Sequence, residues 1–174
     1  MTHAQYVAYF KELAEQHVVL LHDDATKHSF FRANIEELIE GLPGSKISFP
    51  CMALDAQGGQ LFGQNSFFDG QWDNVASAFT ILYKVTQGDY DDENEKLDLA
   101  KTIGFDIIAR MYNDFKTKAA WEDGSLKLYY FNPNTVRYYK VGPLNDQEYG
   151  YRFEFIIGSP LRVDFGYDGL RWGV

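Results

Sequence analysis

Residues 149–157 read Tyr-Gly-Tyr-Arg-Phe-Glu-Phe-Ile-Ile and carry the clearest structural signal in the chain. Every second residue from Tyr149 to Ile157 is aromatic or aliphatic, and the positions between them include Gly150, Arg152 and Glu154. A period of two places alternate side chains on opposite faces of an extended strand. The segment therefore predicts a β-strand with its apolar face on a core and its other face in water.

The chain on either side of this strand is predicted to extend the same sheet. Residues 126–131 and 135–141 flank the turn Asn132-Pro133-Asn134, whose side chains can hydrogen-bond to their own backbone, so a β-hairpin is expected there. A break is predicted at the Gly-Ser-Pro of residues 158–160, followed by a last strand over residues 161–167.

Further strands are predicted in the middle of the chain. Residues 75–85 are apolar on both faces, which is typical of a central strand that is covered on both sides. Residues 47–54 also alternate, but Pro50 cannot donate a ladder hydrogen bond and places this strand at an edge or a bulge. A short strand is predicted at residues 60–63.

Three helices are predicted from apolar stripes with helical spacing. The first begins at a capping box of Thr2 and Gln5, and the second covers about residues 27–42. The longest follows an acidic loop, residues 88–95, where Asp91 or Asp92 is the expected N-cap. The expected buried stripes are Val7, Phe10, Leu13, Ala14 and His17 in the first helix, and Leu97, Ala100, Ile103, Ile107, Ile108, Met111, Tyr112 and Phe115 in the longest.

These elements predict one α+β domain over residues 1–174, with a mixed or antiparallel sheet of about six strands packed by N-terminal helices and one long central helix. Hydrophobic residues make up 45% of the chain and charged residues 24%, the ordinary balance of a globular protein. Aromatic residues are enriched at 17%. They are expected to fill the core and one sheet face, or in part to form a surface for a partner.

The charge and the cysteine content narrow the class of protein. A net charge of −9 repels phosphate, so neither nucleic acid nor an anionic membrane surface is an expected partner. The single cysteine, Cys51, cannot form an internal disulfide, which fits a reducing compartment. No basic and then apolar leader opens the chain, and no apolar run approaches the length that spans a bilayer. We therefore expect a soluble cytoplasmic protein.

No motif predicts a catalytic, cofactor or metal site. His22, Asp23, Asp24 and His28 combine ligand types in a short stretch, but a solvated helix connection accounts for them. Cys51 alternates in phase with the apolar positions of its predicted strand, so an inert, buried thiol is expected.

Two acids near the end of the chain leave one catalytic alternative. Glu154 and Asp164 would form a carboxylate pair if neighbouring strands brought them together, which is the arrangement of glycoside hydrolases. Each also follows an arginine by two positions, Arg152 and Arg162. A cross-strand lattice of ion pairs explains the same residues with no further assumption and is the preferred interpretation.

The loop at residues 64–74 is the predicted partner-binding segment. Phe67, Phe68 and Trp72 lie there among polar residues. Three large rings in a polar loop either fold back over the core or become buried by a partner, and aromatic anchors dominate many protein interfaces. The second alternative assigns partner binding to Phe67, Phe68 and Trp72.

The order of the elements resembles that of a phage assembly family. A leading helix precedes the proline-containing strand at residues 47–54, and an acidic loop precedes the helix around residues 102–115. The predicted strands at residues 75–85 and 149–157 contain Phe79-Thr80-Ile81-Leu82-Tyr83-Lys84-Val85 and Tyr149-Gly150-Tyr151-Arg152-Phe153-Glu154-Phe155. This succession is similar to small phage tail-terminator and tail-completion proteins. The resemblance implies a ring-forming assembly protein without catalytic residues, whose loop at residues 64–74 touches neighbouring subunits.

The sequence is therefore consistent with two functions from different classes. The leading hypothesis is a non-enzymatic structural or interaction protein, of phage-tail type, which forms a homo-oligomer or binds a protein partner. The alternative is a small-molecule-binding domain or an unrecognised enzyme. It requires an aromatic-lined pocket between sheet and helix, near Trp121, Tyr149 or Tyr151.

Overall fold

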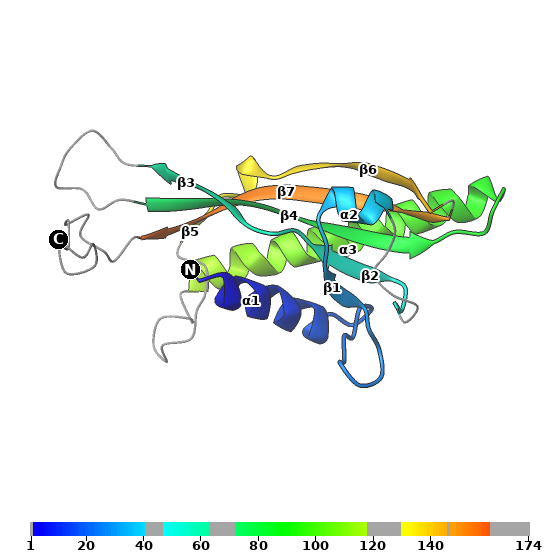
Figure 1. Cartoon of the computed structure of the whole chain (residues 1–174), viewed down its shortest axis with the longest axis horizontal. Helices are drawn as coiled ribbons and strands as arrows, with labels where there is room; N and C mark the ends of the chain where they lie inside the picture. Colours follow the sequence, from blue (N-terminus) through cyan, green and yellow to red (C-terminus); the bar gives the residue numbers. More distant parts are fainter. Residues whose placement is uncertain (1, 41–46, 63–71, 118–129, 146, 161–174) are drawn as a thin grey trace, which may run out of the picture.

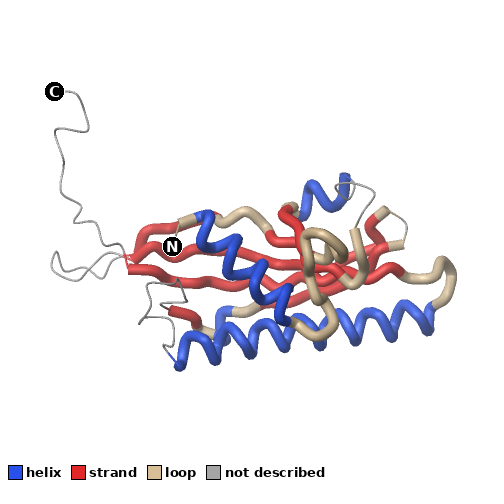
Figure 2. The backbone as a smooth tube through the Cα atoms, turned by 90° about the horizontal axis from the view of Figure 1, so that it is seen from below, coloured by secondary structure: helices blue, strands red, loops and turns tan. Residues whose placement is uncertain are grey.

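The structure, a computed structural model, describes residues 2–40, 47–62, 72–117, 130–145 and 147–160. They form one seven-stranded sheet with helices on both faces (Figure 1, Figure 2). In chain order the elements are α1 (His3–Gln16), β1 (Phe30–Arg32), α2 (Ile35–Glu40), β2 (Cys51–Leu54), β3 (Gly58–Phe62), β4 (Trp72–Lys84), α3 (Tyr90–Thr117), β5 (Tyr130–Phe131), the short 3-10 helix η1 (Pro133–Thr135), β6 (Arg137–Leu144) and β7 (Glu148–Pro160). The predicted α+β class is confirmed.

The sheet is built around two long antiparallel strands, β4 and β7, which pair from Trp72 opposite Pro160 to Lys84 opposite Glu148. β2 and β3 pair in succession with the other edge of β4, and β6 and β5 pair in succession with the outer edge of β7. β1 adds to β2 in parallel, so the sheet is mixed. β4 is therefore the central strand that its two apolar faces predict.

Helices α1 and α3 cover one face of the sheet and enclose the main core (Figure 2). Phe153, Phe155 and Ile157 of β7 lie on this face and are at most 2% exposed, so the apolar side of the predicted strand is confirmed. The ring centroids of Phe79 and Phe153 are 5.2 Å apart. Gly104 lets α3 approach this layer closely, because a Cβ at that position would lie 2.0 Å from Phe153 Cε2.

The helix stripes follow the predictions with one shift. Thr2 and Gln5 form the expected capping box of α1. Tyr6 and Tyr9 are buried in α1, whereas Val7 and His17 are only half-buried, so the stripe is rotated toward the tyrosines. In α3 the predicted stripe is confirmed: its buried members are Leu97, Ala100, Ile103, Ile107 and Met111, and its partly buried members are Ile108, Tyr112 and Phe115.

Helix α2 covers only part of the opposite face. Its Leu38 packs there in a second, smaller core, whose other buried members are Ala33, Cys51, Ala53, Leu82, Val141 and Leu144. Farther along the same face, Ala76 of β4 and Ile156 of β7 are exposed. The sheet thus has one face under two helices and another face that is partly open.

The predicted helix over residues 27–42 is wrong at its beginning. Phe30 and Phe31 belong to β1, and their neighbours in the sheet are Met52 and Ala53. The helix begins only after Asn34, whose side-chain oxygen accepts from the Glu37 amide at 2.9 Å while the Glu37 carboxylate accepts from the Asn34 amide at 2.8 Å. This capping arrangement sets the helix start, and pairing with β2 decides the conformation of the preceding residues.

The predicted hairpin and strand break near the end of the chain are also wrong. β5 and β6 do not pair with each other, because both pair with β7 along the same edge, with η1 between them. β7 itself continues to Pro160 instead of breaking at residues 158–160. The last strand predicted at residues 161–167 lies outside the described residues.

The boundaries of the other elements moved by a few residues. β3 starts at Gly58, β4 starts at Trp72 inside the predicted loop, and β2 starts directly after Pro50. α3 starts at Tyr90, and Asp89 caps it in place of Asp91 or Asp92. The Asp89 carboxylate accepts from the Asp91 and Asp92 amides at 3.1 and 3.0 Å.

Candidate functional site

The predicted partner-binding residues fall largely outside the described part of the chain. Phe67 and Phe68 lie in the undescribed segment 63–71. Trp72 is the first residue of β4, where its backbone lies opposite Phe62 and Pro160, but its side chain is also outside the description. The partner-binding prediction for these three residues therefore stays a prediction.

The face of β7 that was predicted to be exposed to solvent contains a buried ion pair. Arg152 lies opposite Thr80 of β4, and its guanidinium crosses β4 to reach Asp55, just after β2. Two bonds join them, Nη1 to Oδ1 at 2.8 Å and Nη2 to Oδ2 at 2.6 Å. The two side chains are only 8% and 11% exposed. Burial disfavours the charge of Arg152, but the bonds and charge of Asp55, together with Tyr139 and Glu154, raise the pKa of the guanidinium overall.

Glu154 extends this pair toward the edge of the sheet. Its Oε1 accepts from Arg152 Nε at 3.3 Å and from the Tyr139 hydroxyl at 2.8 Å. The pairing of Glu154 with Arg152 that the alternation suggests is present, but it runs along one strand instead of across strands. Asp164, the other member of the proposed carboxylate pair, lies outside the described residues.

Helix α1 supports the ion pair from the other side of the sheet. The Tyr6 hydroxyl donates to the backbone oxygen of Asp55 at 3.1 Å and is also hydrogen-bonded to the Ser77 hydroxyl. Tyr6 is fully buried, and burial raises its pKa. The backbone at Asp55 is therefore held between α1 and β4, where the Asp55 amide donates to the Ala78 oxygen at 3.0 Å.

A hollow of about 550 Å³ lies on the open face beside the ion pair. We call it the sheet hollow. Ala76 and Ala78 of β4 are small, which leaves space between the β2–β3 connection on one side and η1 with β6 on the other. The residues that line it are Asp55, Ala56, Ala76, Ser77, Ala78, Asn134, Thr135, Arg137, Arg152, Glu154, Phe155 and Ile156.

The β6 edge, Arg137 to Lys140, is the most exposed part of any described strand of this sheet. All four residues are exposed, with Tyr138 at 45% and Tyr139 at 44%. Tyr138 packs on the helix-covered side, 5.7 Å from the Phe153 ring, whereas Tyr139 bonds to Glu154 on the open side. Within the described residues β6 pairs only with β7, so its outer backbone edge has no strand beside it.

The cations of the β6 edge differ in their contacts. Lys140 forms an ion pair with Glu93 of α3 at 2.5 Å. Arg137 lies opposite Glu154 in the sheet register, yet within the described part of the chain it forms no ion pair. Arg137 therefore has no ion-pair partner among the described residues, and it belongs to the β6 edge and lines the sheet hollow.

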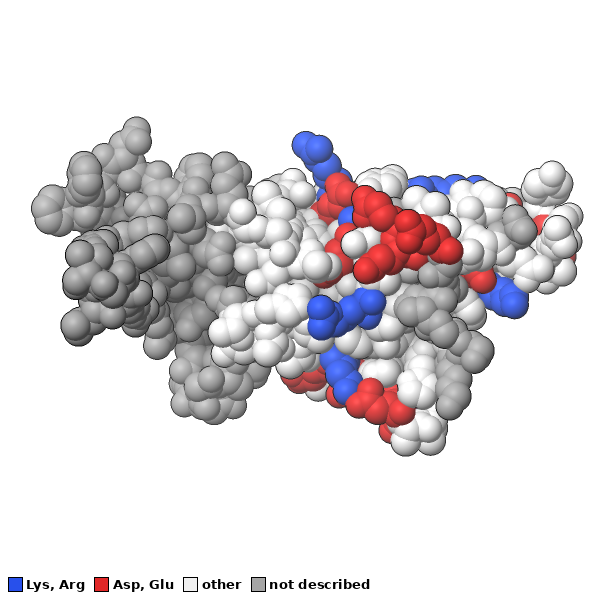
Figure 3. Space-filling view, in the orientation of Figure 1, with Lys and Arg blue, Asp and Glu red and all other residues white. Residues whose placement is uncertain are grey.

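An acidic patch lies on α2. Glu36, Glu37 and Glu40 are all exposed, and we call them the α2 acidic patch. Figure 3 shows acidic side chains gathered over the region where Figure 1 places α2. Glu36 and Glu40 are four residues apart on one helix, so their like charges repel each other.

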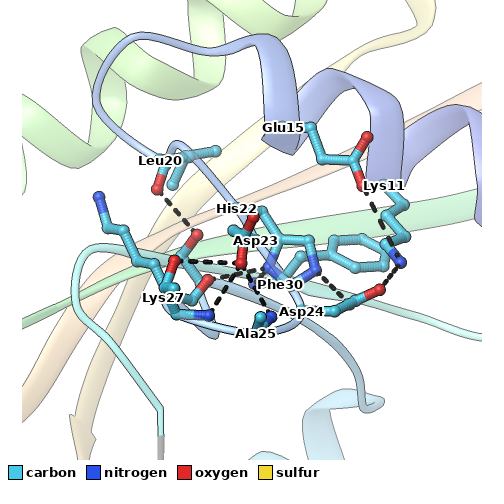
Figure 4. A network of polar contacts seen from close by, with 11 residues as sticks. Lys11, Glu15, Leu20, His22, Asp23, Asp24, Ala25, Lys27 and Phe30 are labelled. Atoms are coloured by element: carbon cyan, nitrogen blue, oxygen red, sulfur yellow. Dashed lines mark hydrogen bonds and ion pairs between the residues drawn. The ribbon is translucent and has the colours of Figure 1, made fainter.

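The cluster around His22 is structural rather than a ligand set. His22 is buried and its Nε2 lies 3.0 Å from Asp24 Oδ1, while the Phe30 amide donates to Nδ1 at 3.2 Å (Figure 4). Asp23 accepts from the Ala25 and Thr26 amides, both at 2.8 Å. This turn joins α1 to β1, so the expected connection between two helices is wrong, whereas its expected solvation is confirmed for residues 23–26, which are exposed. Among the residues that the structure describes, no His, Cys, Asp and Glu group is suited to a metal ion.

Cys51 is buried, as the alternation of its strand predicts. It is 0% exposed and free, and burial raises the pKa of the thiol. A nucleophilic thiolate requires the opposite shift.

The alternative function requires an aromatic-lined pocket near Trp121, Tyr149 or Tyr151. A small cavity of about 130 Å³ borders Tyr149, Tyr90 and Glu93 near the start of α3. That volume is below the range of ordinary small-molecule sites. Trp121, which the alternative also names, lies outside the described residues.

Two buried tyrosines predict a loss of stability in alkali. Burial raises the pKa of Tyr6 and Tyr9 above the ordinary 10.0, and Asp114, 3.0 Å from the Tyr9 hydroxyl, raises that of Tyr9 further. A raised folded pKa stabilises the protein below the unfolded pKa, and this stabilisation is lost as the pH rises above it. Two such phenols give a slope of about −2.7 kcal/mol per pH unit above about pH 10.

Urea unfolding at a series of alkaline pH values measures this slope. A variant with Tyr6→Phe and Tyr9→Phe lacks both ionisable phenol groups. Its free energy of unfolding is therefore expected to fall less steeply with rising pH than that of the wild type. Equal slopes for the variant and the wild type would show that these two phenols titrate alike in the folded and unfolded chain.

No helix among the described residues combines the length and the apolar character that are needed to cross a membrane. The polar groups at the centre of the open face bond mainly to one another, and Arg137 is the charged group there with free donors. Comparison with models of protein families, with curated protein sequences and with solved structures finds no match to this chain.

Proposed function

We propose that the protein is a non-enzymatic assembly protein whose copies associate through the β6 edge. The observation that supports this most is the exposure of all four residues from Arg137 to Lys140, on a strand whose outer edge pairs with no other described strand. A free edge presents unpaired backbone N–H and C=O groups, which favour addition of another chain. Tyr138 and Tyr139 supply the large, partly polar rings that are enriched at protein interfaces.

The charges of the β6 edge argue against symmetric pairing with itself. An antiparallel pair centred between Tyr138 and Tyr139 would place Arg137 directly opposite Lys140 of the second copy. Like charges opposite each other destabilise a strand pair. The complementary surface should therefore be acidic.

The α2 acidic patch is the surface of the same chain that fits this requirement. The patch lies on α2, which packs on the open face of the sheet through Leu38, whereas the β6 edge is a different surface, on the outer side of β7. A contact between β6 of one copy and α2 of the next is therefore head-to-tail, and such contacts close into rings when the rotation allows. Cations from the β6 edge would also relieve the repulsion between Glu36 and Glu40. A ring agrees with the resemblance to phage tail-terminator proteins.

Charge reversal combined with light scattering tests the proposal. The wild type at tens of micromolar is expected to have the mass of several chains, and added salt should lower it because exposed ion pairs are screened. Glu36→Lys with Glu40→Lys, or Arg137→Glu with Lys140→Glu, should each disperse the assembly. Combining all four changes should restore it, since the charges are again complementary.

A matched control distinguishes the effect of reversing the α2 acidic patch from the effect of changing the total charge. Glu95→Lys with Asp98→Lys reverses two exposed acids on α3 that belong to neither surface, and it should leave the mass unchanged. A wild-type mass of one chain, or reversed variants that keep the wild-type mass, would contradict the proposed assembly. Circular dichroism of each variant establishes that it is folded.

A further inference from the structure

We propose that the sheet hollow is a binding site for a small molecule that carries one carboxylate on a compact apolar body. This site shares Arg137 with the proposed assembly contact but differs from it in its ligand and in its test. The hollow has a volume of about 550 Å³, which lies within the range of small-molecule sites.

The shape of the hollow favours an apolar body. Ala76 and Ala78 occupy the β4 positions of the open face, and Ile156 lies opposite Ala76 on β7. Ile156 is 37% exposed, so its apolar surface borders the hollow without being covered by the described chain. Ala76 is also exposed, whereas Ala78 is already buried. A ligand that covers Ala76 and Ile156 removes apolar surface from water, which favours binding.

The charges of the hollow favour a single carboxylate. Asp55 is held by two bonds to Arg152, and Glu154 accepts from Arg152 and Tyr139. Arg137 is the remaining charged side chain that lines the hollow, and among the described residues it has no ion pair. A guanidinium binds a carboxylate through two parallel N–H donors, a geometry that an ammonium group cannot offer.

Other ligand charges fit this site less well. A cation would have to compete with Arg152 for carboxylates that are already bonded. A doubly charged phosphate would meet one free arginine and two carboxylates, Asp55 and Glu154, in the same hollow. A neutral molecule would gain no ion pair with Arg137, whose exposed guanidinium would stay bonded to water. The monocarboxylate is the class that satisfies the free group without displacing an existing bond.

Titration with benzoate, observed by NMR on labelled wild-type protein, tests the assignment. Saturable shifts are expected in the Ala76 and Ala78 methyl signals and in the Arg137 Nε–H signal. Benzamide, which has the same shape without the charge, should produce no saturable shift. Arg137→Gln should weaken benzoate binding about tenfold or more, the effect of losing one charge-assisted pair.

Two further variants make the result specific. Lys140→Gln removes a cation from the same strand that does not line the hollow, and it should bind benzoate like the wild type. Ala76→Leu fills the hollow without touching the β6 edge, so it should abolish benzoate binding while leaving the mass in solution unchanged. Equal binding by wild type and Arg137→Gln, equal binding of benzamide, or no saturable shift in a folded protein would overturn the site. Because Arg137 also belongs to the β6 edge, the titrations are repeated on the variant with Glu36→Lys and Glu40→Lys, in which the proposed assembly contact is broken and Arg137 is left to the hollow. This variant should bind benzoate at least as tightly as the wild type, whether or not the wild type assembles.

Discussion

Asp55→Ala is expected to lower the free energy of unfolding by about 3–5 kcal/mol. The substitution leaves the Arg152 guanidinium in a site where its side chain is only 8% exposed and where two of its bonds are lost. Glu154 touches Arg152 only through Nε at 3.3 Å, so it replaces little of what Asp55 supplies. Urea unfolding monitored by circular dichroism measures the change.

A paired variant separates the cost of an unpaired charge from the value of the ion pair. Asp55→Leu with Arg152→Met removes both charges and keeps apolar bulk, so this variant should be far more stable than Asp55→Ala. Glu15→Ala, which breaks an exposed contact of 3.9 Å with Lys11, should change stability by less than about 1 kcal/mol. An Asp55→Ala protein as stable as this control would mean that Arg152 finds water or another partner in the folded state.

Phe153→Ala is expected to cost about 3–5 kcal/mol of stability. Phe153 is 0% exposed, and its ring lies within 5.7 Å, centroid to centroid, of the Phe105 and Tyr138 rings and 5.2 Å from that of Phe79. Removing it leaves a cavity between β4, β7 and α3 that these rings cannot all collapse to fill. Thermal and urea unfolding measure the loss.

Gly104 provides a sharper test of the same contact. Gly104→Ala should destabilise the protein by about 1–3 kcal/mol, because the new Cβ would fall 2.0 Å from Phe153 Cε2. In the Phe153→Ala background that collision is absent, so Gly104→Ala should cost much less there. A double-mutant cycle therefore predicts strong non-additivity. Additive effects would show that α3 does not approach β7 as closely as the structure has it.

The elements that depend on local pattern were predicted well from the sequence. The period of two over residues 149–157 and the helical stripe from Leu97 to Met111 each bury an apolar face that is visible in the sequence alone. The Thr2–Gln5 capping box is likewise local, since both partners lie within one turn. Periodicity and capping depend on neighbours in the chain, which the sequence displays directly.

The errors arose where distant pairing competed with local preference. Phe31, Ile35 and Leu38 have helical spacing, but Phe30 and Phe31 pair in parallel with β2. The segments around Asn132 resemble a hairpin, but each finds a longer partner in β7. In both cases the backbone hydrogen bonds of the sheet, which join segments far apart, outweighed the local signal.

The amino-acid order by itself determined the α+β class, with its aromatic strands and long helix, because alternation and helical spacing are properties of neighbouring residues. Only the tertiary structure decided the chemistry of the open face. Arg152 and Asp55 are 97 residues apart, and nothing near either residue in the chain indicates their pairing. Their bonds pair the buried charges beside the sheet hollow, and among the described lining residues they leave Arg137 as the charged side chain without an ion pair, because strand order determines which charged side chains meet.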